Sequence, residues 1–401
     1  MLDYYIGVPL CFLGTLVKRL FPHAGSGSSR RTPRNILLIE LSEMGSAILA
    51  DPAMQKLKRE LNANLFFAIF RKNKQSLDIL KSVPDDNIFT IDGSSIGNVT
   101  AGTLKFIAWT RRNQIDTVID LELFSRYSAL LSGFSGARHI VGFHAFKSEG
   151  LYRGNFLTHK VAYNPHQHIA KNFLALTNAL LSNRAELPYS KTRITDEEMV
   201  IRRITVDEEA KTAMHQKIRE AYPDYEAMHH RIVIFNTNSS DLLPLRRWPQ
   251  ESYSALAGRI LDLYPKVIIL LTGDATERAG NTSIITIVND KRCINFAGLT
   301  TVAELPALYS ISELMLTNDS GPAHFASVTN MPTYVFFGPE TPRLYSPLGN
   351  TNLIYSGLAC SPCVSASNHR RSACSDNVCL RIITSDEVFS VLRPGLDMPR
   401  Q

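Results

Sequence analysis

The first half of the chain alternates short apolar runs with longer stretches in which apolar residues recur at helical spacing. Apolar runs of about four to eight residues bounded by turn residues predict buried strands, and the helical spacing predicts amphipathic helices. The predicted strands cover residues 36–39, 65–70, 87–91, 117–120 and 139–143, and the predicted helices cover residues 47–61, 76–81, 104–113, 126–134 and 165–181. This order predicts a parallel sheet with helices on both faces.

A polar stretch at residues 183–205 interrupts this alternation, which restarts after it. The second set of predicted strands covers residues 232–235, 267–272, 284–287, 314–316 and 331–337. The helices predicted there cover residues 207–221, 253–263, 302–310 and 323–328, and one more begins at Glu277. A chain of 401 residues is long enough for two α/β domains. We therefore expect two Rossmann-like domains that face a cleft, with an apolar helix before the first.

The positive charge of the chain is concentrated at its amino-terminal end. Of the formal net charge of +6, residues 1–34 carry +4, because one acidic residue, Asp3, stands against Lys18, Arg19, Arg30, Arg31 and Arg34. The remainder is nearly neutral. This distribution argues against a protein body that binds nucleic acid and indicates a basic amino-terminal segment.

Residues 4–17 are apolar or small throughout, and Lys18 and Arg19 follow them. The run is shorter than the roughly 20 residues that a membrane span needs, and a signal peptide would carry its basic residues before the apolar run. We expect a helix that lies in, or dips into, the cytoplasmic leaflet of the inner membrane, so that the protein is peripheral or monotopic. The alternative is a helix packed on the protein itself. Residues 23–34, rich in Gly and Ser, predict a flexible linker.

The strand predicted at residues 314–316 ends in the turn 317–322, which contains Asp319, Ser320 and Gly321. The helix predicted at residues 323–328 follows directly. Strand, small-residue turn and helix are the elements by which α/β proteins present backbone N–H groups to a phosphate. The next strand also ends in a turn, Gly338-Pro339-Glu340, so two such loops are expected side by side at the carboxyl edge of one sheet.

These residues resemble the carboxyl-terminal signature of glycosyltransferase family 9, the heptosyltransferases, in which an Asn-Asp-Ser-Gly-Pro segment precedes a strand and Phe-Gly-Pro. The resemblance extends to residues 36–45, 52–53, 246–249, 294–300 and 304–305, and so spans most of residues 35–350. It implies the GT-B arrangement, with the acceptor mainly on the first domain and the sugar nucleotide mainly on the second. The expected domains are then 35–190 and 191–358, flanked by the membrane-associated segment 1–34 and a Cys-rich tail, 359–401.

The resemblance also implies a nucleotide-diphosphate sugar as donor, with ADP-heptose expected, and a lipopolysaccharide core or other lipid-linked glycan as acceptor. Negative charge grows on the leaving diphosphate, so cations or N–H groups must lie close to it. The backbone at Ser320 and Gly321 can supply N–H groups, and Arg246 or Arg247 can supply the cation.

Three further residues are candidates for the donor site. Asp319 can bind a sugar hydroxyl or cap the helix. His324 lies one helical turn beyond Ser320 and can bind a phosphate or pack in the core. Glu277, after the strand predicted at residues 267–272, is a candidate for the ribose hydroxyls.

The catalytic base is the point at which this chain departs from the family, whose aspartate after the first-loop glycine is here Ser46. Unassisted serine is a poor base at neutral pH. We therefore expect Glu43, three residues earlier in the same loop, to take the acceptor's proton, unless it only caps or solvates the loop. Glu40, Asp51 and Glu122 are further options. With cationic groups on the diphosphate, catalysis would require no metal ion.

The tail carries four cysteines, Cys360, Cys363, Cys374 and Cys379, in the spacing C-x2-C-x10-C-x4-C. In a cytosolic protein this pattern favours a metal, and structural zinc is the simplest prediction. His369 is an alternative ligand, and two disulfides or four plain thiols are the other options.

The sequence therefore predicts an inverting glycosyltransferase. A non-catalytic sugar-nucleotide-binding or scaffold protein is one alternative, because the family's aspartate is missing. A nucleotide-sugar epimerase, which shares the two-domain architecture, is another.

Overall fold

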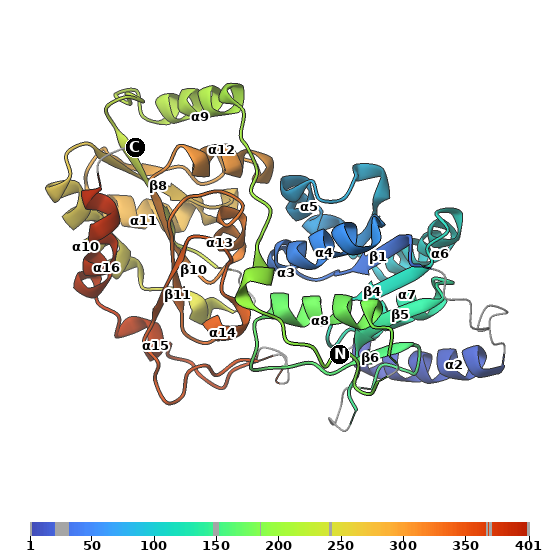
Figure 1. Cartoon of the computed structure of the whole chain (residues 1–401). Coiled ribbons are helices and arrows are strands. Elements are labelled where there is room, and N and C mark those ends of the chain that lie inside the picture. Colours follow the sequence, from blue (N-terminus) through green and yellow to red (C-terminus); the bar gives the residue numbers. More distant parts are fainter. Residues whose placement is uncertain are drawn as a thin grey trace. The chain divides into compact units, whose positions relative to one another are not determined.

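The computed structural model describes residues 2–20, 32–146, 152–184, 186–239, 243–365, 368 and 371–398. The chain divides into two compact units, Met1–Val200 and Ile201–Gln401 (Figure 1). Each unit is a parallel sheet with packed helices, as the alternating pattern predicts. Most of the linker predicted at residues 23–34, and His369, lie outside the described residues.

The first unit contains a six-stranded parallel sheet in the order β3-β2-β1-β4-β5-β6. Its strands are β1 (Asn35–Ile39), β2 (Asn64–Phe70), β3 (Ile88–Ile91), β4 (Thr117–Asp120), β5 (His139–Phe143) and β6 (His159–Val161). The first five confirm the predicted strands. The pattern missed β6, because only three residues, two of them polar, pair with the sheet there. The helices of the unit beyond its amino-terminal pair are α3 (Met44–Leu49), α4 (Asp51–Leu61), α5 (Gln75–Leu80), α6 (Ile96–Arg112), α7 (Arg126–Phe134) and α8 (Ile169–Leu181).

The second unit repeats this topology, because its sheet has the order β12-β11-β10-β7-β8-β9, again parallel throughout. Its strands are β7 (Arg231–Asn236), β8 (Val267–Thr272), β9 (Cys293–Asn295), β10 (Leu314–Asn318), β11 (Thr333–Phe337) and β12 (Thr351–Tyr355). Its helices are α9 (Glu208–Ala221), α10 (Gln250–Leu263), α11 (Arg278–Val288), α12 (Leu305–Ser310), α13 (Gly321–Ala326), α14 (Pro342–Tyr345), α15 (Val378–Arg381) and α16 (Ser385–Asp397).

The strand predicted at residues 284–287 is wrong, because these residues form part of α11. Ile284 is buried at helical spacing from Asn281, whereas Ile287 is exposed. A short run of β-branched residues does not distinguish strand from helix on its own, and here packing against the sheet selects the helix. The strand of this region is β9, which follows α11.

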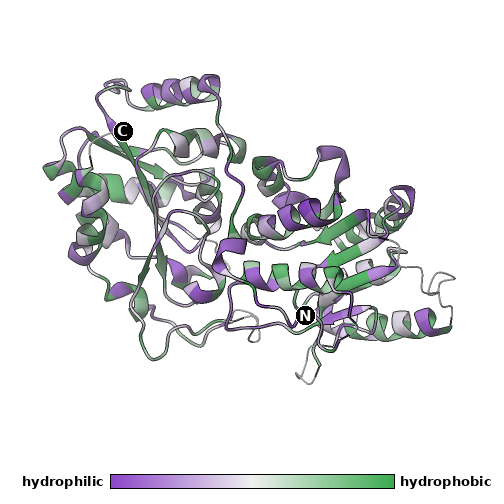
Figure 2. Cartoon of the chain, in the orientation of Figure 1, coloured by the Kyte–Doolittle hydropathy of each residue, from purple (hydrophilic) through white to green (hydrophobic). Residues whose placement is uncertain are grey.

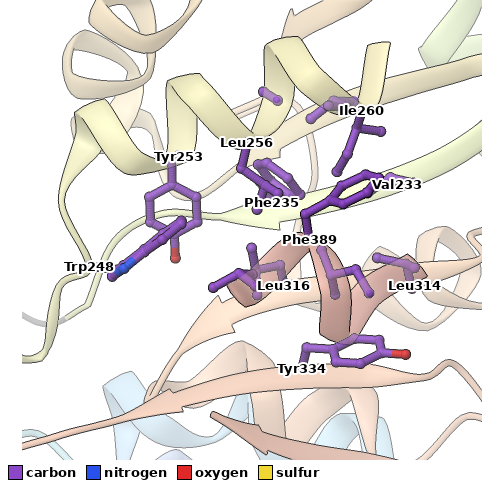
Figure 3. Close-up of a cluster of buried hydrophobic side chains, with 14 of the residues drawn as sticks. Val233, Phe235, Trp248, Tyr253, Leu256, Ile260, Leu314, Leu316, Tyr334 and Phe389 are labelled. Carbon is purple, nitrogen blue, oxygen red and sulfur yellow. The ribbon is translucent and has the colours of Figure 1, made fainter. Parts of the chain in front are cut away.

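The tail contributes to the core of the second unit rather than forming a separate appendage. Val388, Phe389, Leu392 and Leu396 of α16 are buried in the same hydrophobic cluster as β7, β10 and α10. Figure 3 shows Phe389 among the side chains of these elements. The same cluster includes Trp248, whose ring stacks on Phe336 with 4.6 Å between the ring centroids.

The predicted amino-terminal helix is present as α1 (Leu2–Tyr5) and α2 (Gly7–Leu20). Among the described residues no helix combines the length and the apolar character needed to cross a bilayer. The helix α2 packs on α7 through Gly7, Cys11 and Gly14, which are its buried residues. The alternative of a helix packed on the protein therefore holds for one face of α2.

In each sheet, successive strands are added first on one side of the starting strand and then on the other. This reversal falls between β1 and β4 in the first unit and between β7 and β10 in the second. In open parallel sheets the ligands bind beyond the carboxyl ends of the strands at such switch points. The loops that follow β1, β4, β7 and β10 are therefore the candidate ligand-binding loops.

Replacing Gly338 with alanine should lower the free energy of unfolding of the second unit by about 1–3 kcal/mol. The added Cβ would lie 2.8 Å from Cys379 Sγ and 3.0 Å from Leu380 Cγ, where the tail packs on the end of β11. The matched control is Gly258→Ala in α10, whose Cβ would meet nothing within 4 Å and which should stabilise by about 0.5–1 kcal/mol. Urea unfolding followed by Trp248 fluorescence in a Trp109→Phe background measures both, and an unchanged midpoint for Gly338→Ala would contradict this packing.

Candidate active site

The switch point of the first unit holds Glu43 and Ser46, which lie in and just after the loop that follows β1. Ser46 is buried at the start of α3, and its hydroxyl donates a hydrogen bond to Glu43 Oε2 at 3.3 Å. Glu43 is the residue before α3, but its side chain makes no capping hydrogen bond. The two predicted catalytic residues therefore form a pair, and the capping role considered for Glu43 is not observed.

The other carboxylates considered as bases are less suitable. Glu122, after β4, accepts hydrogen bonds from the Leu41 and Ser42 N–H groups at 2.9 and 3.1 Å and from the Ser42 hydroxyl at 2.8 Å. Asp51 is fully buried and accepts from Ser82 Oγ and Gln55 Nε2, both at 2.6 Å. Glu40 is also buried, whereas Glu43 is partly exposed. Glu122 is partly exposed as well, but one of its oxygens already accepts three hydrogen bonds from Leu41 and Ser42, so Glu43 is the better candidate for the base.

Arg153 organises the loop between β4 and α7, a role that no sequence motif predicts. Its buried guanidinium donates to the carbonyl oxygens of Glu122 and Ser125, at 2.6 and 2.9 Å, and to the Asp120 carboxylate. Burial raises the pKa of Asp120 to about 6, although the positive charge of Arg153 opposes the shift. A cavity of about 240 Å³ lies beside this pair. Because Arg153 is saturated with hydrogen bonds, we assign it to holding the loop that carries Glu122.

In the second unit, the switch point brings Arg246 and Asp319 together. Arg246 Nη1 lies 3.4 Å from Asp319 Oδ2, and both side chains are largely buried. Burial raises the pKa of Asp319 above its usual value, and the charge and hydrogen bond of Arg246 oppose the shift. Glu340, in the loop after the neighbouring strand β11, is also buried. Burial raises its pKa to about 8, and the nearby charge of Asp319 adds to the effect.

Asn318, the last residue of β10, holds the loop that carries Arg246. Its side-chain oxygen accepts the Trp248 N–H at 2.9 Å, and its amide nitrogen donates to the Thr237 carbonyl at 2.8 Å. The Trp248 indole N–H donates to the Ile383 carbonyl at 3.0 Å, so the loop is fixed from the other side as well. The sequence motif contains Asn318, but its spacing alone did not reveal this bridging role.

Arg246 and Arg247 have different roles. Arg247 donates to the Ser239 carbonyl through Nε and Nη2, at 3.2 and 2.6 Å, and so fastens the loop after β7. Arg246 faces Asp319 instead. The structure therefore favours Arg246 as the cation of the candidate site, a choice that the sequence left open.

Three buried polar atoms near this point have no hydrogen-bond partner within the part of the chain that the structure describes. They are Asn238 Nδ2, Ser239 Oγ and Arg246 Nε. Buried polar groups are nearly always satisfied, so a cluster of exceptions calls for an explanation such as a ligand or ordered water. All three belong to the segment between β7 and α10, which Asn318 ties to the end of β10.

Ser320, Gly321 and His324 lie at the other side of the same switch point. The Ser320 side chain makes no capping bond, and its hydroxyl lies 3.3 Å from Thr317 Oγ1. His324 is buried in α13. That helix spans six residues, so its dipole contributes little and Arg246 is the main positive group here. A Cβ on Gly321 would approach no atom of the chain closer than 3.8 Å, so packing does not require this glycine.

Glu277 and the tail cysteines are not brought into the site. The Glu277 carboxylate accepts the Asp274 N–H at 2.8 Å in a capping box, so binding of ribose hydroxyls stays a prediction. The four tail cysteines are all free thiols. Within the described ranges no group of three or more His, Cys, Asp or Glu residues is arranged to hold a metal ion. Structural zinc therefore stays a prediction, and His369 lies outside the described residues.

The two units define a protein of the class built from paired Rossmann-like domains, with charged residues at both switch points. The family model described as glycosyltransferase family 9 (heptosyltransferase) matches residues 103–373. The chain belongs to this family.

Curated relatives and solved structures agree with this assignment. Lipopolysaccharide heptosyltransferase 2 of Escherichia coli K12 is 30% identical over 110 residues, which are 27% of this chain and 31% of the relative. Lipopolysaccharide heptosyltransferase 1 of Campylobacter coli is 22% identical over 76% of this chain and 83% of its own. The structure of E. coli ADP-heptose lps heptosyltransferase II superposes with a TM-score of 0.69 at 20% identity, covering 90% of this chain and 98% of that one. The first of these alignments spans less than a third of the relative's length, and the superposition establishes the fold.

Glu340 should make the stability of the protein fall as the pH rises. The folded protein keeps the Glu340 proton up to about pH 8, whereas a glutamate in the unfolded chain loses it near its ordinary pKa of 4.5. The folded state then binds more protons between these values, so stability falls as the pH rises through this window. Glu340→Gln should flatten this dependence by on the order of 1 kcal/mol or more. Melting temperatures of the parent and variant from pH 5 to pH 8 measure the effect, and parallel curves would contradict it.

Proposed function

We propose that this protein is an inverting glycosyltransferase that moves heptose, or a related sugar, from a nucleotide-diphosphate donor to a lipid-linked glycan such as a lipopolysaccharide core. The observation that carries the proposal is the buried Arg246–Asp319 pair with unpartnered polar atoms beside it, at the switch point of a family 9 glycosyltransferase. The name of the solved relative, an ADP-heptose enzyme, supports ADP-heptose as the first donor to test.

The donor site is proposed on the second unit. A diphosphate needs a cation that is held in place, and Arg can make two parallel hydrogen bonds to phosphate oxygens. Arg246 is held by the loop that Asn318 and Trp248 fix, so the guanidinium needs little rearrangement when the donor binds. Asp319 orients Arg246 and, being repelled by phosphate, is assigned to a hydroxyl of the donor sugar. Asn238 and Ser239 provide polar atoms for the nucleotide.

The chemical step is a displacement at the anomeric carbon of the donor. An acceptor hydroxyl oxygen forms the new glycosidic bond while the bond to the diphosphate breaks, and the configuration inverts. Glu43 takes the hydroxyl proton, and the nucleoside diphosphate leaves with the bonding electron pair, stabilised by Arg246. The Ser46 hydroxyl donates to Glu43 and orients the carboxylate. Because Arg246 supplies the positive charge at the leaving group, this step requires no metal ion.

One observation favours a second candidate, a sugar-nucleotide-binding protein without transferase activity. Ser46 occupies the position at which the resemblance places the family's aspartate. If Glu43 does not act as the base, the donor site could be retained while transfer is lost. Turnover of a nucleotide sugar in the absence of any acceptor would instead indicate an epimerase.

Glu43→Gln tests the assignment of the base. The amide keeps the size of the side chain but cannot accept the proton, so we expect a loss of transfer of about 100-fold or more with donor affinity unchanged. Restoring the family pattern with Glu43→Gln and Ser46→Asp together should recover part of the activity. Transfer from ADP-heptose to a heptose-free lipopolysaccharide core measures the rate, and calorimetry measures donor binding. Unchanged transfer by Glu43→Gln would overturn the role, and no transfer by the parent would favour the binding protein.

Arg246→Gln tests the donor site, with Arg247→Gln as its matched control. Loss of a charge-assisted contact to a diphosphate should weaken ADP binding by about 10–100-fold. Arg247→Gln should mainly lower stability, because Arg247 holds the Ser239 carbonyl. Gly321→Ala should leave the melting temperature unchanged and weaken binding if the diphosphate lies against this backbone. Equal ADP affinities for the parent and Arg246→Gln would remove Arg246 from the site.

A further inference from the structure

The helices α1 and α2 are fastened to the first unit along one side. The Asp3 carboxylate accepts the N–H groups of Arg126 and Tyr127, at 3.0 and 3.1 Å, and pairs with the Arg126 guanidinium at 3.2 Å. Thr15 Oγ1 accepts the Asn155 N–H at 2.9 Å, and Lys18 Nζ donates to the Phe156 carbonyl at 3.2 Å. These contacts are distributed from one end of the helix pair to the other, so its orientation on the unit is fixed.

The side of α2 that faces the protein is made of small residues. Gly7, Cys11 and Gly14 are buried, at the spacing of one helical face. A Cβ on Gly7 would lie 2.7 Å from Arg126 Cβ, and one on Gly14 would lie 3.0 Å from the Phe156 ring. The helix therefore approaches α7 closely, and the residues that it buries fully are small ones.

The large apolar side chains point away from the protein instead. An amphipathic helix of a globular domain normally buries this face, but here Tyr5, Phe12, Leu13, Leu16, Val17 and Leu20 are exposed, with relative exposures from 39% to 73%. We call these six residues the outward face. Figure 2 shows hydrophobic residues along α2. A contiguous apolar face of this kind marks an interaction surface.

The charges around the outward face select an anionic partner. Asp3, the one acidic residue among residues 1–34, is paired with Arg126. Arg19 is exposed beside Leu20, and Arg30, Arg31 and Arg34 follow in the sequence. Exposed tyrosine at one end, an apolar face and basic residues at the other end match an interfacial helix at an anionic bilayer.

We propose that the outward face of α1 and α2 docks the protein on an anionic lipid bilayer. The docking itself does not depend on the transferase activity. Asp3 contacts Arg126 and Tyr127, the first residues of α7, directly after the loop that holds Glu122. Bilayer contact therefore lies along α7, from its first residues at the carboxyl edge of the sheet, which Asp3 contacts, to Phe134 at its other end, which lies beside Gly14. Resting on the proposed function, this geometry suits a lipid-linked acceptor at the cytoplasmic face of the inner membrane, with the protein peripheral or monotopic.

Cosedimentation of the full chain with sucrose-loaded vesicles tests the docking. The vesicles contain phosphatidylcholine with or without phosphatidylglycerol, and neither donor nor acceptor is present. Leu13→Glu with Val17→Glu should lower partitioning by about tenfold or more. The matched control, Ile96→Glu with Leu104→Glu on α6, changes residues that are 68% and 67% exposed and should bind as the parent does. Arg19→Gln should weaken binding by about fivefold on phosphatidylglycerol vesicles at low salt and have no effect on phosphatidylcholine alone.

Three results would overturn the proposal. The first is that the parent binds neither kind of vesicle. The second is that the parent and the Leu13→Glu, Val17→Glu variant bind equally well. The third is that the parent is a dimer that does not bind vesicles, whereas this variant is a monomer. The last result would assign the outward face to a second copy of the chain. Circular dichroism and ADP calorimetry on each variant confirm that the fold and donor site are intact. Vesicle binding without any transferase activity would contradict the proposed function but not the docking. Transfer to a delipidated acceptor without vesicle binding would contradict the docking but not the proposed function.

Discussion

The side chain of Asn318 is the connection on which the candidate donor site depends. Its two polar atoms join three segments, because it accepts from Trp248 and donates to Thr237 while lying at the end of β10. Asp319, the next residue, is thereby placed opposite Arg246. A buried amide that lost either bond would leave a polar atom unsatisfied at a cost of about 1–3 kcal/mol. The hydrogen bonds of Asn318 therefore determine the arrangement of the loop that carries Arg246.

The first unit uses the same arrangement with different chemistry. There a carboxylate, Glu122, follows the strand at the switch point and accepts the N–H groups of Leu41 and Ser42 in the loop after β1. In both units a polar side chain after the fourth strand of the sheet, or at its end, reaches the loop of the first strand. The two strands are neighbours in a parallel sheet, so their carboxyl ends lie side by side. At this switch point the loops after the two strands run to opposite sides, and the polar side chain joins them by hydrogen bonds. Glu43 and Arg246 both lie in loops that these bridges hold.

The sequence predicted the features that depend on local pattern. The apolar runs located most strands of both sheets, and the turns at Asp319 and Gly338 were correctly expected on adjacent strands. It could not separate Arg246 from Arg247, because the difference lies in which distant group each one meets. The Arg153–Asp120 pair joins residues 33 positions apart and leaves no local signal. The spacing of Gly7, Cys11 and Gly14 was a local signal of close helix packing, but the long apolar run around these residues concealed it.

The charges at the donor side show why the second unit holds a buried carboxyl that keeps its proton. Asp319 and Glu340 both lie near the Arg246 guanidinium, so ionisation of Glu340 would add a second negative charge beside the buried Arg246–Asp319 pair. Burial raises the pKa of Glu340 to about 8, which leaves the Arg246–Asp319 pair close to neutral at physiological pH. A diphosphate that approaches this site meets one positive and one negative side chain rather than one positive and two negative ones. Protonated Glu340 thus prevents the repulsion that two carboxylates would exert, and Arg246 retains the attraction for a phosphate that the proposed function requires.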